Sequence, residues 1–117
     1  MKESSIPVNF TVKKLKKPLK EKKVTATIRG KTYIQRFQLR QGKKIEVKYN
    51  RERIGFAVIK NIRPISYAKL FDPEIIKKEG FESAEDLIFA LKPFWRYHWN
   101  QIVAGKVKMP LIEFEWI

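Results

Sequence analysis

Alternating apolar and polar positions in the first half of the chain predict short β-strands. The clearest case is 24–29, where Val, Ala and Ile alternate with Thr and Arg, a period that places the two sets on opposite faces of a strand. Residues 44–50 alternate in the same way, and 54–62 is almost continuous in β-forming residues. A shorter extended run covers 7–12. We therefore expect four strands before residue 63.

The segments between these strands contain turn and break signals. Pro18 limits any helix within 13–22 to a short piece. Residues 33–39 are ambiguous, and we expect them to be irregular or extended. The polar segment 51–53 joins two strand candidates into a hairpin, and Pro64 is expected to end the second of them.

The hydrophobic period changes after residue 70, and two short helices are expected there. Asp72 is a typical N-cap before a proline, and Gly80 is a typical residue after a helix end, so the first helix should cover 73–79. Ser83 opens the second helix through a capping-box pattern. The apolar stripe of that helix consists of Leu87, Ala90, Leu91 and Phe94.

Residues 110–117 alternate again and predict a closing strand. This order of strands, helices and a final strand describes a small α+β domain. We expect five to six strands curled into a small β-barrel, with the two helices inserted before the last strand. The domain should cover 6–117, preceded by a flexible N-terminus over 1–5.

The charge of the chain is strongly positive and unevenly distributed. The formal net charge is +14. Residues 1–60 hold 18 Lys and Arg against 4 Asp and Glu, whereas 61–117 holds 8 of each. Such asymmetry predicts an anion-binding face. The anion could be RNA, DNA or an acidic lipid surface, of which lipid is the weakest candidate; a solubility adaptation is the alternative. The phosphate-binding candidates are Lys13, Lys14, Lys16, Lys17, Lys20, Lys22, Lys31, Arg36 and Arg40.

Several kinds of site are excluded by composition. The chain has no cysteine and one histidine, so sulfur-ligated zinc, iron–sulfur clusters, thiol nucleophiles and histidine metal clusters are ruled out. We expect no metal and no cofactor. No stretch of 18 apolar residues is present, and the N-terminus lacks the apolar region of a secretory signal. A cytoplasmic location without membrane insertion is therefore expected.

Three segments in order resemble an ASCH domain, a member of the PUA-like β-barrel superfamily. Residues 25–29, preceded by lysines, are similar to the family's G-x-K-x-x-T-x-R stretch. Residues 42–47 followed by 54–59 resemble its glycine-led hairpin. Glu79-Gly80-Phe81, with Ser83, Glu85, Leu87 and Leu91, resembles its helix entry, and 112–114 fits its last strand. The resemblance covers 6–117 and implies a PUA-like barrel.

This resemblance implies an RNA-related role. Some small bacterial ASCH proteins are amidohydrolases that remove the acyl group from acetylated cytidine, and others are reported to cleave RNA. The amidohydrolases use a Lys, a Thr and a Glu; Thr27 and Glu79 match the last two, but the lysine position falls on Val24. Lys23, one residue earlier, could take its place through a bulge or a register shift. We therefore expect little amidohydrolase activity, and a nucleic-acid-processing enzyme is the alternative to an RNA-binding module.

An alternative register places the matching stretch at Gly30-Lys31-Thr32 with Arg36, but it leaves Ile34 at the threonine position. The preferred register predicts a nucleotide-sized cleft formed by Lys23, Thr25, Thr27, Arg29 and Glu79, with Lys23, Thr27 and Glu79 as the catalytic candidates if the protein is an enzyme.

The aromatic run 94–99 has two interpretations. It could be a core patch that closes the barrel, or a surface on which single-stranded RNA stacks through Trp95 and Tyr97. His98 has no neighbouring metal ligands and is assigned a structural role. A protein partner is a further alternative for the whole chain.

Overall fold

A computed structural model describes residues 5–117, so the predicted flexible segment 1–5 lies outside it except for Ser5. Within this range the chain forms one sheet of five strands in the order β1-β3-β4-β5-β2. β1 runs parallel to β3, and every other pair is antiparallel. The strands are β1 (Ile6–Phe10), β2 (Ala26–Ile28), β3 (Lys44–Tyr49), β4 (Glu52–Ile65) and β5 (Met109–Trp116).

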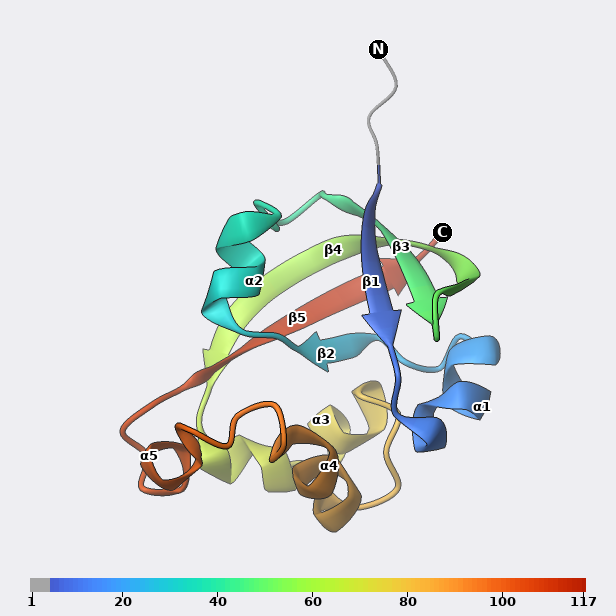
Figure 1. The fold of residues 1–117 in the computed structure, drawn as a ribbon. Helices are drawn as coiled ribbons and strands as arrows, with labels where there is room; N and C mark the ends of the chain where they lie inside the picture. The colour runs from blue at the N-terminus through green and yellow to red at the C-terminus, as the bar shows by residue number, and fades with distance from the viewer. Residues whose placement is uncertain (1–4) are drawn as a thin grey trace.

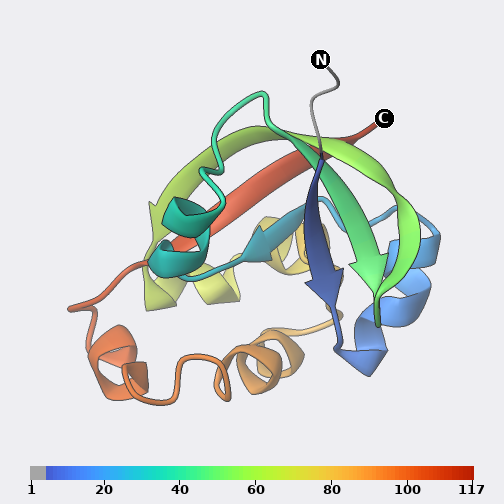
Figure 2. The ribbon, with the colours of Figure 1, turned by 45° about the horizontal axis from the view of Figure 1, so that its top comes forward.

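The helices are short and fall into two groups (Figure 1). A group of helices between β4 and β5 lies beneath the curved sheet, while α1 and α2 sit at its two ends (Figures 1 and 2). None of the helices over residues 5–117 is long and apolar enough to cross a membrane. The helices are η1 (Lys13–Leu15), α1 (Lys16–Lys20), α2 (Lys31–Arg36), η2 (Tyr67–Phe71), α3 (Pro73–Lys78), α4 (Ala84–Leu91) and α5 (Trp99–Val103).

The sheet curls into a half-barrel rather than the closed barrel that was expected. β4 spans 14 residues and pairs with both β3 and β5, with register irregularities after Val47 and after Ile59. Irregularities of this kind bend a strand and increase its twist. The outer strands β1 and β2 do not pair with each other. The prediction of a small α+β domain is confirmed, but the prediction that the sheet closes into a barrel was wrong.

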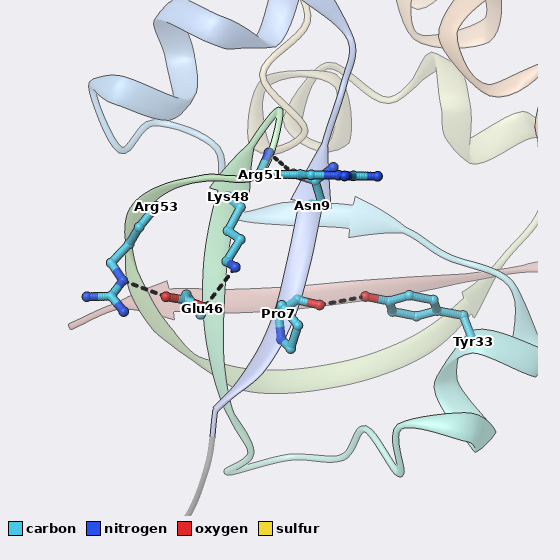
Figure 3. A network of polar contacts seen from close by, with 7 residues as sticks. All are labelled: Pro7, Asn9, Tyr33, Glu46, Lys48, Arg51 and Arg53. Carbon is cyan, nitrogen blue, oxygen red and sulfur yellow. Dashed lines mark hydrogen bonds and ion pairs between the residues drawn. The ribbon is translucent and has the colours of Figure 1, made fainter.

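Side chains occupy the edge of β1 where a closed barrel would have a neighbouring strand. The Tyr33 hydroxyl donates to the carbonyl of Pro7 at 3.1 Å (Figure 3), and Arg29 Nη2 donates to the carbonyl of Asn9 at 3.1 Å. Pro7 has no backbone N–H of its own. A proline and satisfied carbonyls on an edge strand discourage the addition of a further strand.

Two buried clusters hold the structure together. The first fills the half-barrel and includes Ile45 and Phe114. The second lies between the sheet and the helices beneath it and includes Leu87, Ile102 and Met109. The alternation predicted for β3 is confirmed, because Ile45, Val47 and Tyr49 are its buried positions.

Three features of the connections differ from expectation. Residues 33–39 were expected to be irregular or extended, but α2 covers most of them; its helical spacing brings Tyr33 and Phe37 together, with ring centroids 4.9 Å apart. Pro64 does not end β4, because it lies opposite Pro110 in the ladder and the strand continues to Ile65. Three α-helices rather than two precede the last strand, since the aromatic run leads into α5.

The helix-capping predictions are confirmed. Asp72 Oδ1 accepts a hydrogen bond from the Glu74 amide at 3.0 Å, and Ser83 Oγ accepts one from the Asp86 amide at 3.2 Å. Gly80 follows α3 with φ +89°, and a Cβ there would lie 2.7 Å from Val24 Cγ2. Position 80 therefore requires glycine for two reasons. Its backbone is left-handed, and the segment that leads into β2 lies too close to leave room for a Cβ.

Candidate functional site

A cleft of ≈ 1030 Å³ opens beside the unpaired edges of the half-barrel. Its floor is β2, and α2 begins at one end. One wall is the chain from Asn9 to Leu15, which connects β1 to η1. The opposite wall is the C-terminal end of α4 with the connection that follows it, from Ala90 to His98. In Figure 1 this connection arches from α4 toward β2 before it enters α5.

Arg29 is fixed within the cleft by contacts on several sides. Its Nε donates to Thr27 Oγ1 at 3.2 Å and its Nη2 donates to the Asn9 carbonyl at 3.1 Å. The guanidinium carbon lies 4.8 Å from the ring centroid of Phe10 and 5.5 Å from that of Tyr33. Burial lowers the pKa of Arg29, yet a guanidinium stays charged at neutral pH. The cleft therefore contains a positive charge held in one orientation.

Glu79 is the buried acid of the cleft. It follows α3, is 4% exposed, and its Oε2 has no hydrogen-bond partner among the described residues. Burial raises the pKa of Glu79 to about 8, although a hydrogen bond from the Ile28 backbone and the charge of Arg29 act in the opposite direction. At neutral pH the carboxyl is therefore largely protonated, and it offers both a hydrogen-bond donor and an acceptor.

The predicted cleft residues are brought together only in part. Thr27, Arg29 and Glu79 all line the cleft, although Glu79 lies about 50 residues beyond the other two in the sequence. Thr25 instead lines a separate hollow of ≈ 340 Å³ together with Lys60, Lys78 and Glu113. The end of α3 accounts for this difference, because the Thr25 amide donates to the Lys78 carbonyl at 2.7 Å and α3 covers the start of β2.

Lys23 does not reach the cleft. Its side chain is 70% exposed and its Nζ lies 3.6 Å from Glu21 Oε1. Val24, at the lysine position of the ASCH resemblance, is fully buried in the first cluster. The bulge that would have turned Lys23 inward is absent from β2 as the structure describes it, since the β2–β5 register runs without a shift. Of the three candidate catalytic residues, only Thr27 and Glu79 share the cleft.

Some cleft residues were not predicted from the sequence. His98 was assigned a structural role, but its side chain is exposed and it lines the cleft. Arg63, Phe94 and Lys108 line it as well. Their sequence neighbourhoods contain no recognisable motif. Phe94 reaches the cleft on the α4–α5 connection, Arg63 on β4 and Lys108 on the segment between α5 and β5.

The aromatic run divides between the two interpretations left open by the sequence. Trp95 is half-buried, lines the cleft and packs against the second cluster. Tyr97 is 81% exposed and Phe94 is 73% exposed. The apolar stripe predicted for α4 thus holds for Leu87 and Leu91 but fails at Phe94, because the chain leaves the helix after Leu91.

The candidate phosphate-binding side chains are all exposed. Most of them lie on η1, α1 and α2. Lys14 has a specific partner, because its Nζ lies 2.7 Å from Asp86 Oδ1 and so joins η1 to α4. Lys31 lines the cleft itself. No group of three or more metal-ligating side chains is found within residues 5–117.

A second group of polar contacts involves β3, β4 and the turn between them, and it reaches the cleft only at Asn9 of β1. Glu46 accepts a hydrogen bond from Arg53 Nε and lies 3.5 Å from Lys48 Nζ, while the Arg51 amide donates to Asn9 Oδ1 at 2.7 Å (Figure 3). Arg53 and Lys44 also flank the ring of Phe56. The charged groups of Lys44, Lys48 and Arg53 are thus engaged with the protein's own groups, which distinguishes them from the lysines of α1.

Comparison with known proteins identifies the fold alone. No protein-family model matches the chain, and no curated protein is similar to its sequence at a significant level. The crystal structure of hypothetical protein PH0355 matches with a TM-score of 0.61 and 19% identity, over 96% of this chain and 100% of that one. The crystal structure of protein EF3133 from Enterococcus faecalis V583, of family model DUF984, matches with a TM-score of 0.68 and 11% identity, over 98% of this chain and 82% of that one. At these identities the half-barrel with its helices is a shared architecture.

Proposed function

We propose that this protein is an RNA-binding module that holds one nucleotide of a single strand in the cleft. The observation that carries the proposal is the convergence of Thr27, Arg29 and Glu79 in a cleft of ≈ 1030 Å³ on a strongly basic protein. The resemblance to ASCH domains in residues 25–29 and 79–81 points to the same class of ligand.

The net charge favours a polymer over a free small molecule. A chain with a net charge of +14 attracts polyanions from a distance, and binding a free nucleoside requires no such field. The exposed lysines of η1 lie within the wall of the cleft that runs from Asn9 to Leu15, and those of α1 follow directly after it. They are therefore suited to contact phosphates on either side of a nucleotide in the cleft.

The polar groups of the cleft suit the edge of a base. Arg29 supplies fixed donors, and protonated Glu79 supplies a donor beside an acceptor. Phosphate contacts position a nucleic acid, whereas hydrogen bonds to base edges distinguish one base from another. A buried carboxyl oxygen without a partner, such as Glu79 Oε2 among the described residues, is costly in an empty cleft and becomes satisfied when a base edge pairs with it.

The test separates discrimination from total affinity. We would measure the affinity of labelled single-stranded homopolymers of each base by fluorescence anisotropy at several salt concentrations. Arg29→Ala and Glu79→Gln should reduce discrimination among bases more than they reduce total affinity. Arg40→Ala is the control, since Arg40 is exposed and outside the cleft; it should lower affinity for all sequences alike.

Two results would contradict the proposal. Absence of salt-dependent binding to any single strand would remove RNA as the ligand. Equal affinity for DNA and RNA strands of the same sequence, with unchanged discrimination in Arg29→Ala and Glu79→Gln, would leave a basic surface without a nucleotide site.

A further inference from the structure

Two large aromatic side chains lie exposed beside the cleft. Phe94 is 73% exposed and also lines the cleft, and Tyr97 is 81% exposed. The turn after α4 places them there, because the Leu91 carbonyl accepts hydrogen bonds from the amides of Phe94 at 3.0 Å and Trp95 at 3.2 Å. Trp95 turns toward the second cluster, which leaves the side chains on either side of it facing solvent.

The segment that carries these aromatics is purely cationic. Residues 88–111 contain Lys92, Arg96, Lys106 and Lys108 and no Asp or Glu, although 61–117 as a whole holds eight of each sign. All the acids of the second half therefore lie outside this segment. The absence of acids at an aromatic surface gives charge complementarity to a polyanion rather than to a cationic or neutral partner.

Arg96 and Tyr97 form a preorganised pair. The Arg96 guanidinium carbon lies 4.7 Å from the centre of the Tyr97 ring, and its Nη2 donates to the Tyr97 hydroxyl at 2.8 Å. A flat charged group stacked beside an aromatic ring is suited to unpaired bases, since every base offers a π-face and every linkage a phosphate. The N-terminal wall of the cleft, from Asn9 to Leu15, has lysines but no comparable exposed aromatic side chains.

We propose that the RNA strand leaves the cleft across Phe94, Arg96 and Tyr97, which we name the exit strip, with the base next to the cleft stacked on Phe94. This inference rests on the proposed function, and it adds the path of the strand and the smallest ligand that binds fully. The lysines of η1 and α1 then supply the salt-dependent part of affinity, and the exit strip supplies a part that depends on bases rather than on salt.

The experiment compares adenosine monophosphate with a short oligoadenylate as ligands of the wild type, Phe94→Ala and Phe89→Ala. Phe89 is the matched control, because it is an 81% exposed phenylalanine on α4 that does not line the cleft. Phe94→Ala should weaken oligoadenylate binding by about 10-fold. Because Phe94 also lines the cleft, the mononucleotide affinity should fall as well, but by less than the oligoadenylate affinity. The salt slope should stay unchanged, and Phe89→Ala should change none of the three.

The outcomes distinguish the exit strip from the proposed function. If Phe94→Ala and Phe89→Ala bind oligoadenylate with equal affinity, the exit strip is overturned and the proposed nucleotide site in the cleft still stands. An equal loss of mononucleotide and oligoadenylate affinity in Phe94→Ala would also overturn it, by assigning the ring to the nucleotide inside the cleft alone. No binding of either ligand by the wild type would overturn both proposals. A dimer of the wild type that dissociates in Phe94→Ala, measured by sedimentation, would overturn the exit strip by showing a second copy on this surface.

Discussion

Arg29 and Asn9 join the two strands at the outer positions of the sheet. Arg29 follows β2, and its Nη2 reaches the carbonyl of Asn9 in β1 at 3.1 Å. In a closed barrel, ladder hydrogen bonds would make this connection; in the half-barrel one guanidinium makes it, and the same group remains exposed to the cleft. The charge that a ligand would meet is thus also a structural element.

Arg29→Met should therefore lower stability as well as ligand discrimination. The substitution removes hydrogen bonds to Thr27 and Asn9, and hydrogen bonds that involve a charged group contribute about 1.5 to 3 kcal/mol each. We expect the free energy of unfolding, measured by urea titration, to fall by about 3 kcal/mol. Arg36→Met on α2 serves as the control, since Arg36 is exposed and stacks on the neighbouring Phe37 ring; an equal decrease in both variants would contradict a structural role for Arg29.

Glu79 should make stability depend on pH. A folded-state pKa of about 8 against 4.5 when unfolded means that the folded chain holds the proton more tightly. The free energy of unfolding should thus decrease as pH rises from 4.5 toward 8, by at most about 5 kcal/mol, and change no further above that. Glu79→Gln should remove this decrease, and urea titrations of both proteins across this range measure it.

The comparison of the two proteins isolates the effect of one carboxyl, because all other titrating groups are shared. Glu74→Gln, on the exposed side of α3, provides a control with the same chemical change outside the cleft. If the free energies of unfolding of the wild type and Glu79→Gln change with pH in parallel, Glu79 is ionised at neutral pH. The cleft would then lack the hydrogen-bond donor that we assign to the protonated Glu79 carboxyl.

Gly80→Ala should be strongly destabilising. The new Cβ would lie 2.7 Å from Val24 Cγ2 and the residue would need a φ of +89°. Overpacking and a left-handed alanine each cost about 1 to 2 kcal/mol, so we expect the free energy of unfolding in urea titration to fall by about 3 kcal/mol. Gly30→Ala, with open space around it, should cost less than about 1 kcal/mol.

A second substitution separates the two causes. Val24→Ala removes the nearest atom in conflict, so in the double variant Gly80→Ala should cost less than it does alone. The backbone strain and the contact with Leu15 Cδ2, at 3.0 Å from the new Cβ, should remain. Strict additivity of the two substitutions would show that the closeness to Val24 is not the source of the strain.

The protein should lack amidohydrolase activity toward acetylcytidine. The reason is the absence of a lysine amine at the position of Val24, which is buried, while Lys23 faces solvent beside Glu21. Incubation of the purified protein with acetylcytidine and chromatography of the products would check this. Rapid release of acetate that disappears in Lys23→Ala would contradict both the expectation and the position of Lys23.

The lysines of η1 and α1 should set the salt dependence of RNA binding. Replacing Lys13, Lys14, Lys16 and Lys17 by Glu should weaken the binding of all single-stranded RNAs alike. The slope of log affinity against log salt concentration should decrease by about 0.7 for each phosphate that is no longer neutralised. Lys69 and Lys77 replaced by Glu provide a control on the neutral half of the chain. An unchanged slope in the quadruple variant would identify the cluster as a solubility adaptation.

Local rules predicted the elements whose signals lie within a few residues. Asp72 and Ser83 cap their helices as expected because the capping atoms are two or three residues from the amides that they accept from. The β3–β4 hairpin follows from alternation and a polar turn for the same reason. In contrast, 33–39 carries aromatic and branched residues compatible with both helix and strand, and the packing of Tyr33 and Phe37 on the first cluster decides for helix.

The candidate site was predictable where one strand and one motif define it. Thr27, Arg29 and Glu79 were found from alternation and from the resemblance. Thr25 was misplaced because α3 covers the start of β2, an arrangement that strand period cannot reveal. His98 and Phe94 were missed because their place in the cleft depends on how the α4–α5 connection returns toward the sheet. Lys108 was missed because its place depends on the path of the segment between α5 and β5.

The β2–β5 pairing has a consequence for synthesis of the chain. Ile28 lies opposite Leu111, so the floor of the cleft is joined to a strand that is made 83 residues later. Pairings between such distant segments form late and slowly. On the ribosome, β1, η1 and α2 must therefore wait until the last strand emerges before the cleft has its floor in place. Neither a nascent chain nor a fragment that ends before β5 should capture a ligand in the cleft, which makes ligand binding a measure of completed folding.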